Sequence, residues 1–403
     1  MTTSRASTSG ERATERWDGV LGAREWVFLV VSLALLPALI PLRMVALLLV
    51  CAVAAFAVSR TGWRRNVKMV AALAVVTVLV VARQLSPPPP VAHVLWAGIG
   101  IYAFFVLRII DVAVTRDDGL PDGTLANRFA RFLLYVFFAP LLFAGPVLMQ
   151  RDLWRSYSRR LPTGSELLRH AIRFAWGAVK FYVLFEVFLR WQGKLAFAAI
   201  TGSTANLPID LPIFLCAWAA VGLTLVFVYV GFSGFSDMGS SVARVLGFQV
   251  YENFRLPLLA PSPLEFWKRS NISTYRWLMT HVFLPFWRHD LIDAKIVTTF
   301  VASALWHVAA IRTITVGAVA QLSLGSALNA VGVLAVWHLG RDASLTAGPR
   351  RSSERSPART ALAVAATFVF TAFVFQLFWA GIVNTPASQT VSLFKALVPG
   401  LGG

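Results

Sequence analysis

Charged residues and cysteines are both scarce in this chain. Of its 403 residues only 14% are charged, whereas 57% are apolar, and several apolar segments reach the ~20 residues that span ~30 Å of hydrocarbon. This composition excludes a soluble domain. The two cysteines, Cys51 and Cys216, both stand inside apolar runs. A disulfide framework and a cysteine-based metal site are therefore not indicated.

Acidic residues are also few, because 19 Asp and Glu stand against 37 Lys and Arg, which gives a formal net charge of +18. In a soluble chain this balance would suggest a nucleic-acid partner. Here the basic residues gather between apolar runs, for example in 60–68 and 341–359, as the positive-inside rule expects of cytoplasmic loops. We therefore expect a lipid bilayer as the partner and no nucleic acid.

Two kinds of catalytic site find no support in the sequence. No two histidines stand four residues apart and no acidic partner has ligand spacing, so we expect no metal site. The stretch 231–235 reads Gly-Phe-Ser-Gly-Phe and misses the Gly-x-Ser-x-Gly pattern of a nucleophilic serine by one position.

The long apolar runs predict α-helices, because a helix satisfies its own backbone hydrogen bonds in lipid. We predict an all-α integral membrane protein with about ten transmembrane helices. Residues 1–25 are expected to be a loose cytoplasmic tail and 26–403 a single membrane domain, in which 341–359 forms a flexible cytoplasmic loop. Within this domain, Pro37 and Pro41 are predicted to mark a tight turn between two helices.

Two stretches interrupt the pattern of simple spans. Pro140, Gly145 and Pro146 break up the segment 132–149, which predicts a broken or re-entrant element. Between Gly231 and Lys295 the apolar runs are short, which is typical of amphipathic helices near the cytoplasmic interface.

His307 is the histidine whose position points most clearly to chemistry. It follows Lys295 by 12 residues, which at ~1.5 Å per residue places it roughly 18 Å into a ~30 Å core. Ionisable groups at that depth are functional candidates, although a hydrogen-bonded structural histidine is the alternative. His338, beside Gly340 and Arg341, is expected at the membrane edge.

Another apolar span also carries charges. Glu186 and Arg190 share a helix face at a spacing of four residues, and Lys180 lies on a different face. We interpret them as a structural ion pair and a snorkelling lysine.

The stretch GFSDMGSSVARVLGF, followed by ENFRLPLLAPSPLEFWKR, resembles the signature block of the membrane-bound O-acyltransferase family. The likeness is closest to the bacterial branch, which includes the membrane components of alginate O-acetylation and of teichoic-acid D-alanylation. The matching positions are Gly234, Ser236, Asp237, Met238, Ala243, Arg244, Gly247, Phe248, Glu252, Asn253, Phe254, Pro257, Glu265, Phe266, Trp267 and Arg269.

Three shorter segments match in the same order, and one position departs. Residues 143–146 resemble the family's Ala-Gly-Pro segment, 177–180 its Gly-x-x-Lys, and 305–307 its Leu-Trp-His. The family block continues Trp-Arg-Arg-Trp-His-Ile-Ser, whereas this chain reads Trp-Lys-Arg-Ser-Asn-Ile-Ser from Trp267 onwards. Asn271 therefore stands where the family has its first histidine, and Val308 replaces the glycine that commonly follows the catalytic histidine.

The resemblance implies transfer of an acyl group, acetyl in particular, from cytoplasmic acyl-CoA to a hydroxyl of an extracytoplasmic acceptor. It also implies re-entrant and interfacial helices around a central tunnel, a place in the plasma (inner) membrane, no permanently bound cofactor, and an extracytoplasmic partner that accepts the acyl group. His307 would act as the general base and Asn271 would orient the acyl carbonyl. Coenzyme A phosphates, or alternatively anionic lipids, would contact Arg244, Lys268, Arg269 and Arg276.

Other interpretations stay open. A transporter or flippase would also contain a broken helix and a buried ionisable residue, and Asn271 favours a non-catalytic scaffold. His281, ten residues after Asn271, is a further candidate for the role of the missing histidine.

Overall fold

The structure is a computed structural model, and it describes residues 19–85, 92–115, 123–142, 145–285, 291–311, 313–340 and 356–399. The described residues form helices and a single isolated β-bridge between Tyr157 and Phe248. The all-helical expectation is therefore confirmed for this part of the chain. The N-terminal tail up to residue 18 and the loop 341–355 lie outside the described residues.

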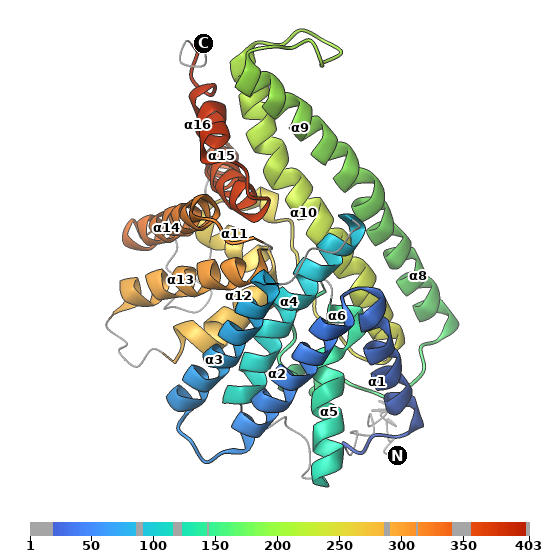
Figure 1. The fold of residues 1–403 in the computed structure, drawn as a ribbon. Helices are drawn as coiled ribbons and strands as arrows, with labels where there is room; N and C mark the ends of the chain where they lie inside the picture. The colour runs from blue at the N-terminus through green and yellow to red at the C-terminus, as the bar shows by residue number, and fades with distance from the viewer. Residues whose placement is uncertain are drawn as a thin grey trace, which may run out of the picture.

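The N-terminal third forms one bundle (Figure 1). Its elements are α1 (Ala23–Leu35), η1 (Leu36–Ala38), α2 (Leu42–Arg60), α3 (Arg65–Gln84), α4 (Ala92–Val114), α5 (Leu125–Phe137), α6 (Ala139–Leu142) and α7 (Gln150–Arg155). The turn predicted at Pro37 and Pro41 is confirmed, because η1 separates α1 from α2. Residues 19–25, which we expected in the tail, belong to the fold: Glu25 is fully buried and its carboxylate accepts hydrogen bonds from Tyr157 and Arg159.

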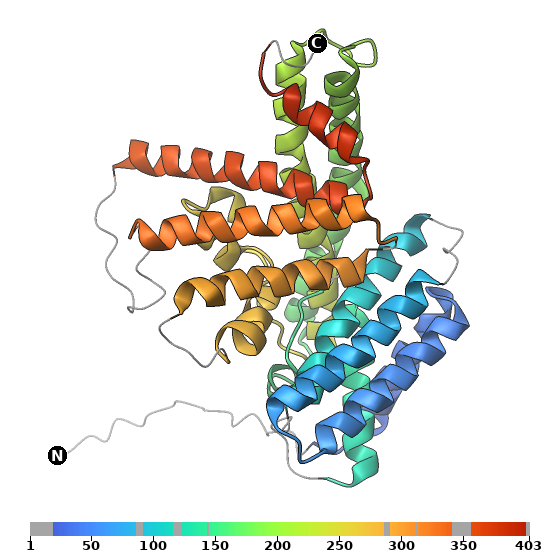
Figure 2. The same cartoon turned by 60° about the vertical axis from the view of Figure 1, so that its left-hand side comes forward.

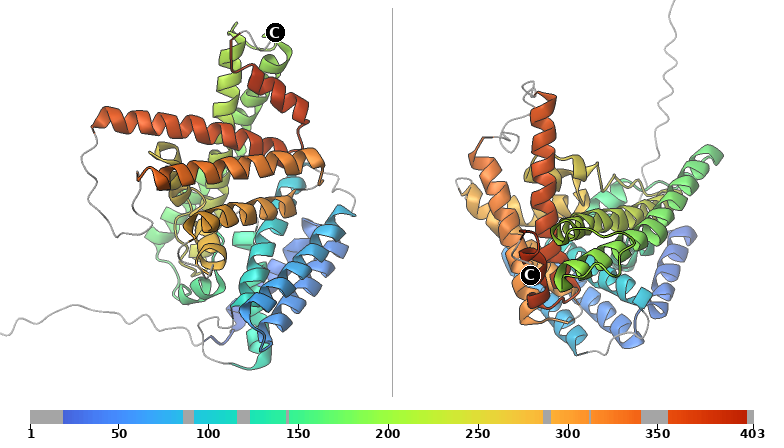
Figure 3. Two further views of the ribbon diagram at one scale, coloured as in Figure 1. Left: turned by 90° about the vertical axis from the view of Figure 1, so that its left-hand side faces the viewer. Right: turned by 90° about the horizontal axis from the view of Figure 1, so that it is seen from above.

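The remaining helices form two further groups. The first is a long hairpin of α8 (Gly164–Ala178), η2 (Val179–Phe185, a π-helical segment), α9 (Glu186–Thr201) and α10 (Ile213–Val245). The second consists of α13 (Ile292–Ala310), α14 (Val316–His338) and α15 (Pro357–Ile382), which pack side by side, with α16 (Ala387–Lys395) against α9 (Figures 2 and 3). Short elements lie between the groups: η3 (Pro257–Leu259), α11 (Pro263–Arg269), α12 (Ile272–Leu278) and η4 (Met279–Phe283).

Six of the described helices are long and apolar enough to cross a membrane, namely α2, α3, α10, α13, α14 and α15. The expected number of about ten spans is therefore not confirmed. Elements that we counted as spans are short or interrupted in the structure. Helix α1 has 13 residues, whereas a span needs about 20, and the apolar span that carries Lys180 and Glu186 is divided among α8, η2 and α9.

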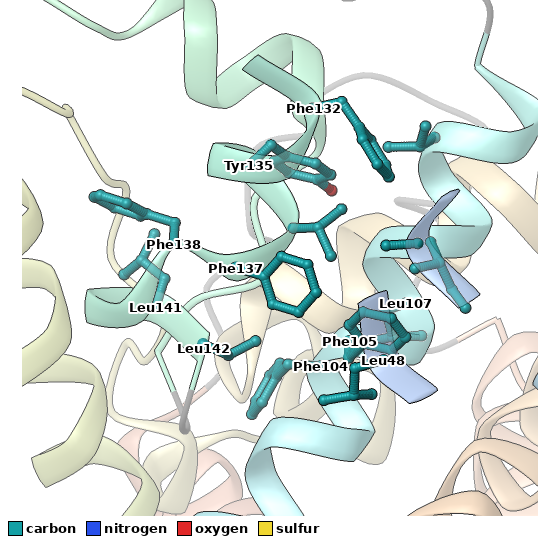
Figure 4. Packing of buried hydrophobic residues seen from close by; sticks show 14 of the residues in the cluster. Leu48, Phe104, Phe105, Leu107, Phe132, Tyr135, Phe137, Phe138, Leu141 and Leu142 are labelled. Atoms are coloured by element: carbon teal, nitrogen blue, oxygen red, sulfur yellow. The ribbon is translucent and has the colours of Figure 1, made fainter. Parts of the chain in front are cut away.

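The helix break expected within 132–149 is confirmed between α5 and α6. Figure 4 shows the packing there, where the ring of Phe137 at the end of α5 lies against that of Phe105 on α4, with ring centroids 5.6 Å apart. Arg108, only 2% exposed, reaches the break from α4. Its guanidinium donates hydrogen bonds to the carbonyls of Tyr135 and Val136 at 3.0 Å each and to that of Leu141 at 2.8 Å. It thereby satisfies carbonyl groups that a terminating helix leaves without partners.

We expect Arg108→Met to lower the free energy of unfolding by roughly 3 kcal/mol or more, because each buried carbonyl left without a partner costs about 1–3 kcal/mol. Unfolding of the detergent-solubilised protein, followed by tryptophan fluorescence, measures the change. Arg190→Met is the matched control, because the side chain of Arg190 is 77% exposed and lies 3.9 Å from Glu186; its effect should stay within about 0.5 kcal/mol. Equal stability of the two variants would contradict this role of Arg108.

The expectation that short interfacial helices begin at Gly231 is wrong for its first part, because α10 continues without a break to Val245. The reason is the close packing of α10 against α8. A Cβ atom added to Gly177 would lie 2.7 Å from the carbonyl oxygen of Gly234, and one added to Gly234 would lie 2.7 Å from that of Gly177. Glycine in a membrane helix thus allows two backbones to touch rather than ending the helix.

Candidate functional site

His307 lies in the last turn of α13, three residues before the helix ends at Ala310. Its ring packs between Trp306 and Phe378 of α15, with centroid distances of 4.6 and 5.1 Å. Nδ1 lies 2.7 Å from the backbone carbonyl oxygen of Ser303. Because a carbonyl only accepts, Nδ1 carries the proton, so the neutral ring keeps the lone pair of Nε2 available.

The last turn of α13 is held by helices from the N-terminal third. Trp306 Nε1 donates to the carbonyl of Ala103, which lies in the middle of α4, at 2.8 Å. Arg83, near the end of α3, donates to the carbonyl of Ala309 at 3.0 Å. These contacts, which the sequence does not reveal, fix the turn that carries His307. The depth of His307 in the bilayer stays a prediction.

Asn271 stands at the N-terminus of α12 with φ 48° and ψ 49°, in the left-handed region. Asparagine is among the residues that tolerate this conformation. Its side-chain oxygen accepts a hydrogen bond from Asn253 Nδ2 at 3.1 Å. Asn271 thus lies at the corner between α11 and α12, with a fixed backbone and a fixed carboxamide.

Asn271 and His307 line the same cavity, which has a volume of about 260 Å³. The cavity lies between α4, η2, α10, α12, α13 and α15, and most of its wall is apolar or aromatic. Its lining includes Phe104, Phe181, Phe185, Tyr229, Phe254, Phe266, Trp267, Phe300, Trp306, Phe375, Phe378 and Trp379. An apolar cavity with a few polar groups is the usual form of a small-molecule site, so the two residues that the sequence singled out come together at one such site.

Beside the cavity, a network of ion pairs joins α8, η2 and α10 to the loop after α10. Asp237 accepts hydrogen bonds from Arg173 at 2.6 Å and from Lys180 at 2.7 Å. Glu252 pairs with Arg173 at 2.5 Å and with Arg244 at 3.0 Å. The interpretation of Lys180 as a snorkelling residue is therefore wrong, because its carboxylate partner lies 57 positions away in the sequence. Glu186 and Arg190, by contrast, form only a long exposed contact of 3.9 Å.

The network also sets the charge of Glu252. Burial alone would raise the pKa of this carboxyl, but the hydrogen bonds from Arg173 and Arg244 outweigh it and lower the pKa to about 2. Since the folded-state pKa is depressed, the ion pairs contribute stability fully above the ordinary pKa near 4.5. That contribution is lost as the pH falls from there through about 2.

The four cations expected to hold coenzyme A all have carboxylate partners, and none lines the cavity. Arg244 pairs with Glu252, and Lys268 and Arg269 both pair with Glu265, at 3.2 and 3.4 Å. Arg276 is 3.8 Å from Asp152, its side chain is 48% exposed, and it lies over the ring of Tyr251. Arg276 is thus the most accessible of the four.

His281 does not line the cavity. It is buried in η4, where Nε2 lies 2.9 Å from Asp111 of α4 and the ring packs on Trp277. The hypothesis that it replaces the missing histidine at the cavity therefore finds no support in this geometry. His281 instead connects the end of α12 to α4.

Comparison with known families matches residues 127–324 to the membrane-bound O-acyltransferase family. These residues form a domain of that family. The domain contains Asn271, His307 and the whole ion-pair network, whereas α1 to α4 and α15 lie outside the matched range. The O-acyltransferase domain thus receives part of its cavity wall, and the helices that hold His307, from the rest of the chain.

Curated relatives agree with the family assignment. The chain is similar to a protein of Pseudomonas syringae named "Probable alginate O-acetylase AlgI", with 29% identity over 227 residues, 55% of this chain and 40% of the relative. It is also similar to the protein of that name from Pseudomonas aeruginosa, with 29% identity over 187 residues, 46% and 33% of the two chains. A "Peptidoglycan O-acetyltransferase" of Helicobacter pylori is 24% identical over 190 residues, 45% and 34% of the two chains. The matched region thus spans less than half the length of each of these relatives.

Proposed function

We propose that this chain is a membrane-bound O-acyltransferase that moves an acyl group, acetyl in particular, from acyl-CoA to a hydroxyl group. The observation that carries the proposal is the position of His307, which lines an aromatic cavity with Nδ1 held by a carbonyl and the lone pair of Nε2 free. The names of the relatives support an O-acetyl product. A cavity of about 260 Å³, below the roughly 300–1,000 Å³ of sites for drug-sized ligands, favours a short acyl group.

The chemistry follows from the imidazole of His307, which can accept a proton inside the cavity. The acceptor oxygen attacks the thioester carbonyl carbon while His307 Nε2 takes the hydroxyl proton. The tetrahedral intermediate then breaks its carbon–sulfur bond, and the imidazolium returns the proton to the leaving thiolate of coenzyme A. The aromatic wall excludes water, which protects the thioester from hydrolysis.

The sides of the membrane also belong to the proposal. The acyl-CoA enters from the cytoplasm, and the acceptor is an extracytoplasmic hydroxyl of a cell-envelope polysaccharide or of a partner protein at the plasma (inner) membrane. Arg244, Lys268, Arg269 and Arg276 are the cations proposed for the phosphates of the donor. Among them Arg276 should contribute most, because its side chain is the most exposed of the four and its carboxylate contact, 3.8 Å to Asp152, is the longest.

We expect the purified protein to bind acetyl-CoA, and to bind it more weakly as salt rises from about 0.1 M to about 1 M, which shortens the Debye length from ~10 Å to ~3 Å. Titration calorimetry in detergent measures the affinity. Arg276→Ala should weaken binding, and the control Arg190→Ala should not, because Arg190 is an exposed residue of α9. No heat of binding at ~1 mM acetyl-CoA by folded protein would count against the enzyme and in favour of a scaffold.

A further inference from the structure

Asn253, in the loop after α10, makes hydrogen bonds through both ends of its side chain. It is 4% exposed. Its Oδ1 accepts from the backbone N–H of Ser273 at 2.9 Å, and its Nδ2 donates to Ser236 and to Asn271 Oδ1, at 3.1 Å each. The backbone carbonyl of Asn253 accepts from Ile272 N–H at 2.9 Å. Asn253 therefore holds both the backbone and the carboxamide at the start of α12.

These contacts decide which end of each carboxamide is the oxygen. The N–H of Ser273 can only donate, so the atom of Asn253 that faces it must be the oxygen. The other end of Asn253 is then the NH₂ group, a donor, and the atom of Asn271 that faces it must be an oxygen as well. This leaves the NH₂ group of Asn271 as its free end. Among the described residues it has no hydrogen-bond partner, and Asn271 lines the cavity together with His307.

We propose that Asn253 is a positioning residue that fixes the polarity of the Asn271 carboxamide, so that an N–H donor and not an oxygen meets the acyl carbonyl. The inference rests on the proposed function. As the acceptor oxygen adds to the carbonyl carbon, negative charge develops on the carbonyl oxygen, and Asn271 Nδ2 donates to it. A donor held in place beforehand stabilises such an oxyanion at no cost of reorganisation.

The proposal explains how the site works with Asn271 where the family resemblance expects a histidine. A carboxamide has a donor end and an acceptor end of nearly equal shape, so it helps an oxyanion only if its neighbours exclude the inverted orientation. Asn253 supplies that constraint, because its own orientation is set by a backbone N–H that cannot change role.

The test measures acyl transfer by four variants in parallel with their thermal stability. Asn271→Ala should lower kcat by up to about 10²–10³-fold, the effect of losing one oxyanion donor, with little change in KM for acyl-CoA. Asn271→Asp keeps the bond from Asn253 but offers the cavity an oxygen, so its kcat should be lower still. In Asn253→Asp, the carboxylate at position 253 can only accept, so the NH₂ group of Asn271 turns toward it and away from the cavity. This variant should therefore lower kcat about as much as Asn271→Ala.

The double variant separates positioning from a general structural role. In the Asn271→Ala background there is no carboxamide to invert, so adding Asn253→Asp should change kcat by no more than about twofold. An equal loss in both backgrounds would overturn the proposal. So would wild-type turnover by Asn271→Asp, or by a stably folded Asn253→Asp variant.

Failure of the proposed function itself is recognised separately. If the wild-type protein transfers no acyl group, the hydrogen bond between Asn253 and Asn271 can still be tested. The measurement compares the melting temperatures of Asn253→Ala, Asn271→Ala and the double variant. Non-additive shifts support the Asn253–Asn271 bond, and strictly additive shifts refute it.

Discussion

His307→Ala should abolish acyl transfer, with kcat at least 10²–10⁴-fold below that of the wild type, the range for a lost general base. The substitution removes the group that takes the hydroxyl proton. Folding and donor binding should remain, because the hydrogen bond that the ring makes among the described residues goes to Ser303 of its own helix. The packing of Trp306 against α4 does not depend on it. His307→Gln, which keeps much of the volume but cannot take the proton, should be equally inactive.

Another histidine of the chain gives a matched control. His338, at the end of α14, is 61% exposed and pairs with Asp293 at 3.0 Å, outside the cavity. His338→Ala should transfer at the wild-type rate within about twofold. Rates are measured as coenzyme A released from acetyl-CoA in the presence of acceptor, and melting temperatures as a check of folding. A folded His307→Ala variant with normal turnover would refute the role of His307 as the base.

Asp237→Ala should cause the largest loss of stability, roughly 3–5 kcal/mol, because it removes the carboxylate shared by Arg173 and Lys180. The three side chains are only 14–22% exposed, so solvent cannot replace the lost partner. Within the described part of the chain, Lys180 would keep its hydrogen bond to Ser233 and Arg173 would keep its ion pair with Glu252. Because the network joins η2 to α10 next to Phe181 and Phe185, we also expect the cavity wall to loosen.

Chemical unfolding in detergent measures this effect. The control is Glu186→Gln, which breaks an exposed ion pair of 3.9 Å and should change stability by less than about 0.5 kcal/mol. Replacing Lys180 by Met together with Asp237→Ala should recover part of the loss, since one unpaired cation is then gone. Wild-type stability of Asp237→Ala would show that the network contributes nothing.

The sequence predicts those features that depend on local pattern. The turn at Pro37 and Pro41 follows because proline ends a helix, and the break near Pro140 follows for the same reason. The apolar runs 296–311 and 315–337 likewise correspond to the hairpin of α13 and α14, close to the observed bounds of these helices. In each case the signal lies within a few residues of the structure that it determines.

Features that depend on distant partners were missed or misread. The short apolar runs after Gly231 suggested separate short helices, because the sequence does not show that Gly234 of α10 lies against Gly177 of α8. Lys180 has its partner Asp237 on another helix, and Arg108 donates hydrogen bonds to carbonyl groups of α5 and α6. Helix rise and the family resemblance selected His307, and the resemblance selected Asn271. Neither revealed the hydrogen bond from Asn253 to Asn271 or the contacts by which α3 and α4 hold the last turn of α13.

Under the proposed function, this protein passes an acyl group from coenzyme A to a hydroxyl through the cavity that His307 and Asn271 line. The most direct test uses proteoliposomes in one orientation, with acetyl-labelled acetyl-CoA on the side of the loop 60–68 and a polysaccharide acceptor on the other side. We expect labelled ester on the acceptor with the wild-type protein and with the His338→Ala control, but none with His307→Ala. Label that never leaves coenzyme A, although the protein binds acetyl-CoA, would refute acyl transfer by this protein and identify a scaffold instead.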